Sequence, residues 1–383
     1  MFLIGTDNVV DYLIEKKVCQ VGEVQQSKIE PKIFKNFNLL IHLSSERSLF
    51  VKQEMHNQSG QTNGDFSLEW QLHQFLQSRP ELADIQALTS EVIEADLNHS
   101  ILIFNYLKRY IDLDTFYTQN QHFPLSVATA LGNALATLHR ATFNQAEYRA
   151  ALSASDDSTL EQVPDFTHGL EFLTPEIFGT VSTAGLKFYQ LYQRHPELGQ
   201  ALASLRDSFT PCCLTHNDLK FANILLHTDW NGQPPEAPIR LIDWEKWSWG
   251  DPASDLGMVL AEFLKIWLKS LTVSPDLDMH LSLRSATTPL EKIQPSMVAF
   301  VQAYLRQFPE LRTARPQLIT QVLQLTGFAL IESIQAKLHY LEPFGNVGIC
   351  ILQVAKTLLC EPEQSISVVF GNNFPDLIHG SLT

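Results

Sequence analysis

The chain has 383 residues, of which 45% are hydrophobic, and its formal net charge at pH 7 is −15. It is long enough for two domains or lobes, and its acidic balance argues against binding to nucleic acid or to an anionic membrane and favours a neutral or cationic substrate. Five cysteines without a CxxC spacing, and no apolar run of ~18 residues, predict a cytoplasmic protein without a disulfide framework, a zinc site or a membrane span.

The N-terminal part of the chain reads as a small, strand-rich region. Apolar residues at helical spacing predict a short helix within residues 8–16, and a second helix is expected at residues 66–76. Short alternating or apolar segments predict antiparallel strands at residues 18–24, 37–43, 48–53, 92–94 and 101–106. The last of these strands, ILIFNY, is apolar almost throughout, so we expect it to be buried on both faces.

From about residue 107 onward the pattern is predominantly helical. Helices are predicted at residues 125–140, 186–194, 198–208, 254–270, 295–307, 316–340 and 347–359. Residues 366–370 fit a strand or an extended tail. The sequence therefore predicts an α+β fold with a small antiparallel-sheet lobe over residues 1–104 and a larger, mainly helical lobe over residues 105–383. A cleft between two lobes is a common place for a ligand.

Residues 214–257 combine polar side chains with flanking apolar runs. They read LTHNDLKFANILL and, after a polar turn, IRLIDWEKWSWGDPASDLG. Carboxylate and amide groups held at fixed points of a rigid framework suit a site for metal and phosphate, which is what phosphoryl transfer from ATP requires. A single Asp or His of this kind is usually a hydrogen-bonded turn residue, so it is the combination that indicates function.

HNDLKFANIL, followed by LIDWE and GDPASDLG, resembles the aminoglycoside phosphotransferase and choline kinase-like branch of the protein kinase-like superfamily. The resemblance spans about residues 33–257. It implies a protein kinase-like two-lobe fold with a nucleotide-binding N-terminal lobe. It also implies ATP and Mg²⁺ as cofactors, and transfer of the γ-phosphate to a hydroxyl of a small molecule.

The resemblance also assigns a role to each residue of the motif. Asp218 is implied to orient or accept the proton of the acceptor hydroxyl, with Lys220 near the transferred phosphate. Asn223 and Asp243 are the implied ligands of Mg²⁺. The residues implied to support the geometry of the loop are His216, Asp251 and Asp255, of which the last is expected to bond loop backbone groups from the start of the next helix.

The N-terminal lobe carries the expected cofactor contacts. Lys52 ends a predicted strand and Glu69 lies on the helix that follows, so the two are expected to meet, with the lysine reaching the phosphates. Phe104 and Tyr106 lie in the expected hinge, where backbone groups bond an adenine edge. One feature departs from the family: residues 33–43 contain no glycine, so Lys35, Asn36 and Asn38 would have to serve as the phosphate loop.

The motif leaves the acceptor open. Residues 150–186 contain acids but no Lys or Arg, which predicts either an ordinary solvated surface or a rim that attracts a cation. An aminoglycoside, choline, a sugar, homoserine or a macrolide would suit the same core. A kinase acting on Ser or Thr of a peptide is a second interpretation, and an inactive pseudokinase or binding module is a third. No feature predicts an oligomeric state.

Overall fold

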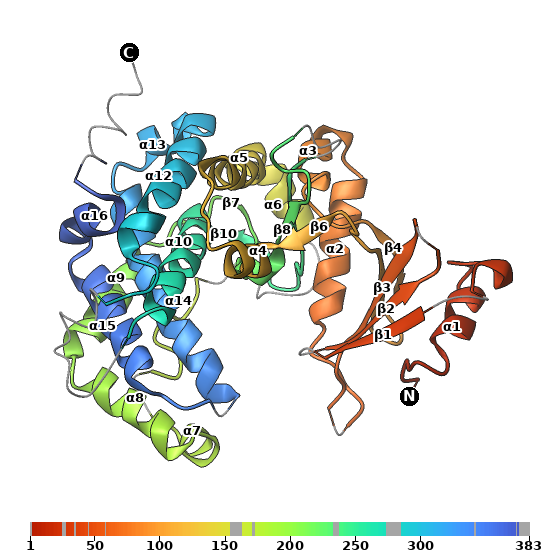
Figure 1. The fold of residues 1–383 in the computed structure, drawn as a ribbon, viewed down its shortest axis with the longest axis horizontal. Helices are drawn as coiled ribbons and strands as arrows, with labels where there is room; N and C mark the ends of the chain where they lie inside the picture. The colour runs from red at the N-terminus through yellow and green to blue at the C-terminus, as the bar shows by residue number, and fades with distance from the viewer. Residues whose placement is uncertain are drawn as a thin grey trace. The chain divides into compact units, whose positions relative to one another are not determined.

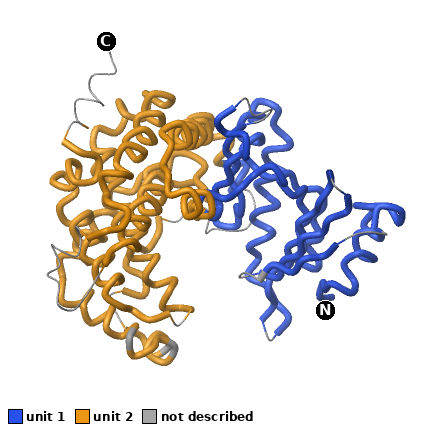
Figure 2. Tube along the Cα trace, viewed as in Figure 1, with its two compact units in different colours: residues 1–113, 150–155, 222–247 blue, residues 114–149, 156–221, 248–383 orange. Residues whose placement is uncertain are grey.

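A computed structural model describes residues 2–24, 28–33, 36–44, 46–57, 59–153, 163–170, 173–232, 237–272, 285–340, 342–372 and 374. The chain divides into two compact units (Figure 2): unit 1 contains residues 1–113, 150–155 and 222–247, and unit 2 contains the remainder. The predicted α+β class, an antiparallel N-terminal sheet followed by a larger helical part, is confirmed (Figure 1). None of the helices in the described ranges is long and apolar enough to cross a membrane. The lobe boundary after residue 104 stays a prediction.

Unit 1 is built on a five-stranded antiparallel sheet in the order β1-β2-β3-β5-β4. Its strands are β1 (Lys28–Ile33), β2 (Phe37–His42), β3 (Ser48–Gln53), β4 (Val92–Asp96) and β5 (Ile101–Asn105). Ile101 and Ile103 pack into the cluster that includes α1 (Val9–Glu15), whereas Leu102 and Phe104 pack against Phe66 of α2 (Asp65–Gln77). Because side chains alternate along a strand, β5 is buried on both faces, as predicted.

A second, three-stranded sheet of unit 1 has the order β6-β8-β9. Its strands are β6 (Tyr110–Asp112), β8 (Ile224–His227) and β9 (Ile239–Leu241). The short helices η2 (Pro80–Leu82) and α3 (Ala83–Gln86) follow α2, and the backbone N–H of Leu241 donates to the carbonyl of Leu88 at 2.7 Å. This bond ties the second sheet to the segment after α3.

Unit 2 is mainly helical, with one two-stranded sheet of β7 (Cys213–Thr215) and β10 (Ser248–Gly250). Two helices contain a boundary between the units: α4 (Leu113–Asn120), after its first residue, and α6 (Ala146–Leu152), before Ala150. The other helices are α5 (Leu125–Thr142), α7 (Pro175–Thr180), α8 (Thr183–Gln193), α9 (Pro196–Ser208), α10 (Pro252–Lys269), α12 (Leu290–Gln307), α13 (Pro309–Ala314), α14 (Leu318–His339), α15 (Asn346–Cys360) and α16 (Pro362–Phe370). The most extensive helix pairs are α5 with α12, α10 with α14, and α14 with α15.

Glycine permits the closest of these helix contacts. A Cβ at Gly132 of α5 would lie 2.3 Å from the carbonyl oxygen of Phe300 in α12. A Cβ at Gly257 of α10 would lie 2.9 Å from backbone atoms of Leu325 and Thr326 in α14. The helix backbones approach each other where no side chain intervenes, and this positions α10, whose start carries Asp255.

Two predictions of local structure are wrong, and one strand was not predicted. Residues 18–24 form no strand but contain the 3₁₀ helix η1 (Val21–Glu23), because Gln20 and Glu23 form a reciprocal capping box. Residues 366–370 belong to α16, where Pro362 sets the first turn and Val369 and Phe370 are buried; tertiary packing overrides the strand preference of the β-branched run. Strand β1 was not predicted, because its polar sequence, KIEPKI, pairs only as an edge strand.

Candidate functional site

The hairpin of β8 and β9 brings Asn223 and Asp243 to one end of the two strands. Ile224 pairs with Leu241, and the N–H of Ile242 donates to the backbone carbonyl of Asn223 at 3.0 Å. Asp243 follows directly, with a φ of 69°. Such a left-handed conformation is uncommon outside glycine, and where it persists it often marks a functional position. The chain thus places an amide and a carboxylate close together in unit 1.

Lys52 joins this end of the hairpin to α2. Its Nζ lies 3.4 Å from Oε2 of Glu69 and 2.5 Å from Oδ1 of Asp243. The side chain of Glu69 is only 1% exposed, while that of Asp243 is 25% exposed. The lysine also lies 5.5 Å from the centroid of the Phe104 ring. The contact that the sequence predicts between Lys52 and Glu69 is therefore present.

Lys52 and its acidic neighbours shift one another's pKa. Burial lowers the pKa of Lys52, but the carboxylates of Glu69 and Asp243 outweigh burial and raise that pKa above its ordinary value. Burial raises the pKa of Glu69 to about 7, with Lys52 opposing and the negative charges of Asp243 and Glu245 adding to the rise. Among the described residues, Lys52 thus lies between the carboxyl groups of Glu69 and Asp243.

Two residues that sequence reasoning missed hold Glu69 in place. Glu54, immediately beyond β3, accepts the backbone N–H of Asp65 at 3.2 Å and that of Phe66 at 3.4 Å, and so caps the start of α2. The backbone N–H of Trp244 donates to Oε1 of Glu69 at 3.4 Å. Because Glu54 is two residues after Lys52, the cap fixes α2 relative to the strand that carries the lysine.

The expected hinge residues differ in what they offer. Phe104 is buried, and its ring meets His73 edge to face at 6.1 Å. Tyr106 is 40% exposed, but its backbone N–H donates to Ser48 at 2.9 Å and its carbonyl accepts from Lys108 at 3.0 Å. Both backbone groups of Tyr106 are therefore used within the chain.

The glycine-free segment is only partly described. Lys35 lies outside the described residues. Nδ2 of Asn36 donates to Oε2 of Glu245 at 3.4 Å, and Nδ2 of Asn38 donates to the carbonyl of Asn36 at 2.9 Å. The two asparagines thus bond each other and Glu245, and their part in binding phosphate stays a prediction.

In unit 2, the loop after β7 carries Asp218 and Lys220. Nζ of Lys220 lies 3.1 Å from Oδ2 of Asp218, and the two side chains are 49% and 16% exposed. The backbone N–H of Phe221, next in the chain, donates to Oε2 of Glu262 of α10 at 3.3 Å. The loop is therefore held through its backbone, while its charged side chains reach solvent.

Asp255, in the first turn of α10, is the main support of this loop. Its Oδ2 accepts the N–H of His216 at 2.8 Å, and its Oδ1 accepts the N–H of Asn217 at 2.9 Å, which are the predicted bonds to the loop backbone. Nε2 of His139 lies 3.1 Å from the same Oδ2, and Nδ1 of His139 lies 2.9 Å from the hydroxyl of Tyr304. His139 therefore bridges Asp255 and Tyr304, with Nε2 in reach of the carboxylate and Nδ1 in reach of the hydroxyl.

The network is fully buried, and it keeps Asp255 ionised. Burial alone would raise the pKa of Asp255, but the hydrogen bond from His139, the charges of His139 and His216, and the backbone bond together lower it below its ordinary value. A buried carboxylate that accepts several N–H groups is stable in its charged form. The Asp255 network therefore fixes the backbone on which Asp218 is carried.

Asp251 fixes the start of α10. It is the N-cap, accepting the N–H of Ala253 at 2.9 Å, and it also accepts the N–H of Thr210 at 2.9 Å. Arg315 binds both of its carboxylate oxygens, at 2.5 and 2.8 Å. His139, Tyr304 and Arg315 were not found from the sequence, because nothing near them in the chain marks them as partners of the motif.

The contact between Lys52 and Glu69 in unit 1 and the bonds from Asp255 to its loop in unit 2 are arrangements that the sequence predicts. The profile of the phosphotransferase enzyme family matches residues 64–272, more than half of the chain. The chain therefore belongs to the phosphotransferase enzyme family, and the predicted resemblance is confirmed.

Several solved structures are similar to this chain. Choline kinase LicA from Streptococcus pneumoniae is 18% identical, with 92% of this chain and 99% of that chain covered and a TM-score of 0.43. The ADP-bound aminoglycoside phosphotransferase APH(2'')-Ib is 14% identical, with 93% and 99% covered and a TM-score of 0.43. Macrolide 2'-phosphotransferase MphH from Brachybacterium faecium is 13% identical, with 93% and 99% covered and a TM-score of 0.44. A search of curated proteins finds no match.

Proposed function

We propose that this protein transfers the γ-phosphate of ATP to a hydroxyl group of a small molecule, with Mg²⁺ as the second cofactor. The observation that carries the proposal is the position of Lys52, whose ammonium contacts Glu69 at 3.4 Å and Asp243 at 2.5 Å. A buried lysine held by one acid and shared with a second is suited to neutralising nucleotide phosphates beside a metal ion.

The donor atoms available at the end of β8 and β9 fit Mg²⁺. Asn223 and Asp243 offer amide and carboxylate oxygens, the hard ligands that this ion prefers. No group of three potential metal-ligating His, Cys, Asp or Glu side chains occurs in the described ranges. Mg²⁺ does not require such a group, since it is commonly held by one or two carboxylates together with substrate phosphates. Asn223 and Asp243 would hold the ion, which would offset the charge of the phosphates.

For adenine, we assign the backbone of Asn105 and Leu107. Tyr106 uses its N–H and carbonyl within the chain, and the N–H of Asn105 donates to the carbonyl of Glu91 at 3.1 Å. The carbonyl of Asn105 and the N–H of Leu107 would then offer one acceptor and one donor to the base. Phe104 and Tyr106 would contribute their rings alone.

In the reaction, Asp218 would receive the proton of the acceptor hydroxyl. The oxygen of that hydroxyl would bond to the γ-phosphorus while the bond between the γ-phosphorus and the leaving ADP breaks. Lys220, 3.1 Å from Asp218, would neutralise charge on the transferred group. Asp255 would keep the loop in place. We assign nucleotide binding to residues 1–104 and the acceptor, neutral or cationic, to residues 105–383, and we place the reaction in the cytoplasm.

The nucleotide site is tested by isothermal titration calorimetry of the full chain with ATP, with and without Mg²⁺. Asp243→Asn is expected to lower the Mg²⁺-dependent affinity at least about tenfold, a loss of about 1.4 kcal/mol. Asp229→Asn is the matched control, because Asp229 also belongs to unit 1 but forms an exposed pair with Arg109. Absence of ATP binding by the unmodified chain, or equal affinities for the two variants, would contradict the proposal.

A further inference from the structure

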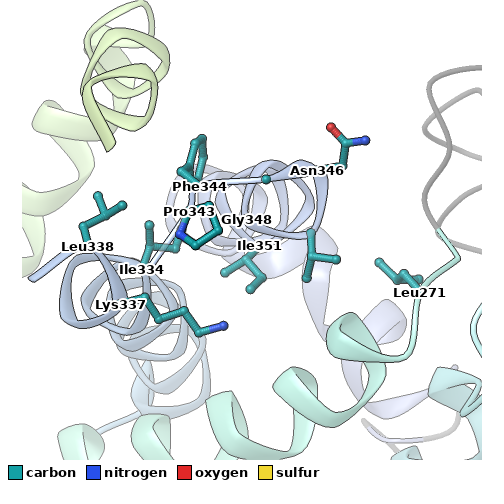
Figure 3. A pocket seen from close by; sticks show the side chains of 11 residues that line it. Leu271, Ile334, Lys337, Leu338, Pro343, Phe344, Asn346, Gly348 and Ile351 are labelled. Carbon is teal, nitrogen blue, oxygen red and sulfur yellow. The ribbon is translucent and has the colours of Figure 1, made fainter. Parts of the chain in front are cut away.

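Unit 2 contains a cavity away from the loop of Asp218 (Figure 3). Its volume is about 270 Å³, close to the lower end of the ~300–1,000 Å³ typical of small-molecule sites. It lies between the last turns of α14 and the start of α15, with Leu271, just beyond α10, on another side. Glu262, which accepts the N–H of Phe221, is roughly 14 Å back along α10, so the cavity is separate from the loop of Asp218.

The walls of the cavity are mostly apolar. Ile334 and Leu338 line it from α14, and Phe344, Val347 and Ile351 line it from the segment before α15 and from α15 itself. A Cβ at Gly348 would lie 2.6 Å from the ring of Phe344, so glycine there lets the ring pack against the first turn of the helix. Such a surface binds an apolar body.

The charged group of the cavity is a lysine. Among the described residues that line the cavity, Lys337 is the one with a charged side chain, and none is acidic, although the whole chain carries a net charge of −15. Nζ of Lys337 lies 4.0 Å from Oε2 of Glu342, with side chains 44% and 55% exposed. A pair this long and this exposed contributes about 0–1 kcal/mol, so a carboxylate ligand can replace Glu342.

The start of α15 adds to the preference for an anion. Asn346 and Val347 also line the cavity at the start of α15, where Gly345 provides no side-chain cap. The first N–H groups of a helix have no partner within it and carry partial positive charge.

We propose that this cavity binds a small molecule with an apolar body and a single carboxylate group. The carboxylate contacts Lys337 and the first turn of α15, and the apolar body lies against Ile334, Phe344 and Ile351. This binding does not depend on the proposed phosphotransfer, and it is measured without nucleotide.

The test is isothermal titration calorimetry of the full chain with hexanoate and octanoate, and with octylammonium and octanol as probes of matched shape. Octanoate is expected to bind with a Kd of about 1 mM or lower, octanol more weakly, and octylammonium not at all. Lys337→Met keeps most of the side chain but removes the charge, and it is expected to weaken octanoate binding about tenfold or more. Lys187→Met, on the exposed face of α8, is the control and leaves the affinity unchanged.

Val347→Trp is a second variant, because a larger side chain at this half-buried position fills the cavity without removing Lys337. It is expected to abolish octanoate binding while circular dichroism shows the unmodified fold. No heat of binding with either carboxylate would overturn the proposal. Equal binding of octylammonium and octanoate, or an unchanged affinity in Lys337→Met, would overturn it as well.

Discussion

Replacing Asp255 by Asn tests whether one buried carboxylate holds the loop that carries Asp218. Asp255 accepts three N–H groups, from His216 at 2.8 Å, Asn217 at 2.9 Å and His139 at 3.1 Å. An asparagine has one acceptor oxygen and one amide nitrogen. In Asp255→Asn the nitrogen must therefore face at least one N–H group, which loses its hydrogen bond and meets a donor instead.

The number of hydrogen bonds that Asp255 accepts sets the expected loss of stability. Hydrogen bonds to a charged group contribute about 1.5–3 kcal/mol each, and an unpaired buried donor costs a further 1–3 kcal/mol or so. We expect Asp255→Asn to lower the free energy of unfolding by about 3–5 kcal/mol, which many domains of this size can lose and stay folded. Phosphate transfer is expected to fall about a hundredfold, because small displacements of a reacting group have effects of that size.

Chemical denaturation at several pH values measures the first effect, and Asp114→Asn, an exposed position, is the control. The pKa of Asp255 is lowered in the folded chain, so its contribution is complete above the unfolded value of 3.8 and is lost as the pH falls through the folded pKa. The difference in the free energy of unfolding between the unmodified chain and Asp255→Asn should therefore become smaller below about pH 4. If this difference does not change with pH, or if the variant loses less than about 1 kcal/mol of unfolding free energy, Asp255 does not hold the loop in the way inferred.

Three further variants test other parts of the structure. Lys52→Met leaves Glu69 without its counter-charge, and calorimetry should show ATP affinity reduced about tenfold or more; unchanged affinity would exclude Lys52 from the nucleotide site. Burial, with Lys52, lowers the pKa of His73 to about 4 from 6.5, so the unfolded chain binds more protons between these values and stability falls as the pH drops through them. Between pH 7 and pH 4, His73→Leu should lose up to about 3 kcal/mol less unfolding free energy than the unmodified chain, as measured by chemical denaturation. An equal loss in both proteins would argue against a lowered pKa of His73. Gly132→Ala places a Cβ 2.3 Å from the carbonyl of Phe300 and should destabilise by about 1–3 kcal/mol in thermal denaturation, whereas an unchanged midpoint would show that α5 and α12 can separate freely.

The parts of the fold that the sequence predicts are those with local signals. Strand β5 was predicted because its apolar run is continuous, and α2, α5 and α10 because their apolar residues recur at helical spacing. Residues 366–370 show the limit of this approach. Their β-branched residues favour a strand, but Pro362 and the burial of Val369 and Phe370 make the segment helical, and the burial is not visible in the local pattern.

The candidate site likewise contains residues that the sequence predicts and residues that it does not. Asp218, Asn223, Asp243 and Asp255 stand in one short stretch, where their spacing can be compared with a known motif. His139 reaches Asp255 from 116 positions away. A lone histidine on a helical face is ordinarily a core residue, and nothing in the sequence predicts its partner. Supporting residues of this kind become visible only when the helix packing is known.

The most direct test of the central claim is transfer of labelled γ-phosphate from ATP to pooled acceptors. The pools contain amino sugars, amino alcohols, nucleosides and Ser/Thr peptides, and the assay compares the unmodified chain with Asp218→Asn, each with Mg²⁺ and with EDTA. We expect label in a small-molecule pool, and we expect this transfer to require Mg²⁺ and to fall at least about a hundredfold in the variant. Label confined to the peptide pool, no transfer with Mg²⁺, or equal transfer by Asp218→Asn would contradict it.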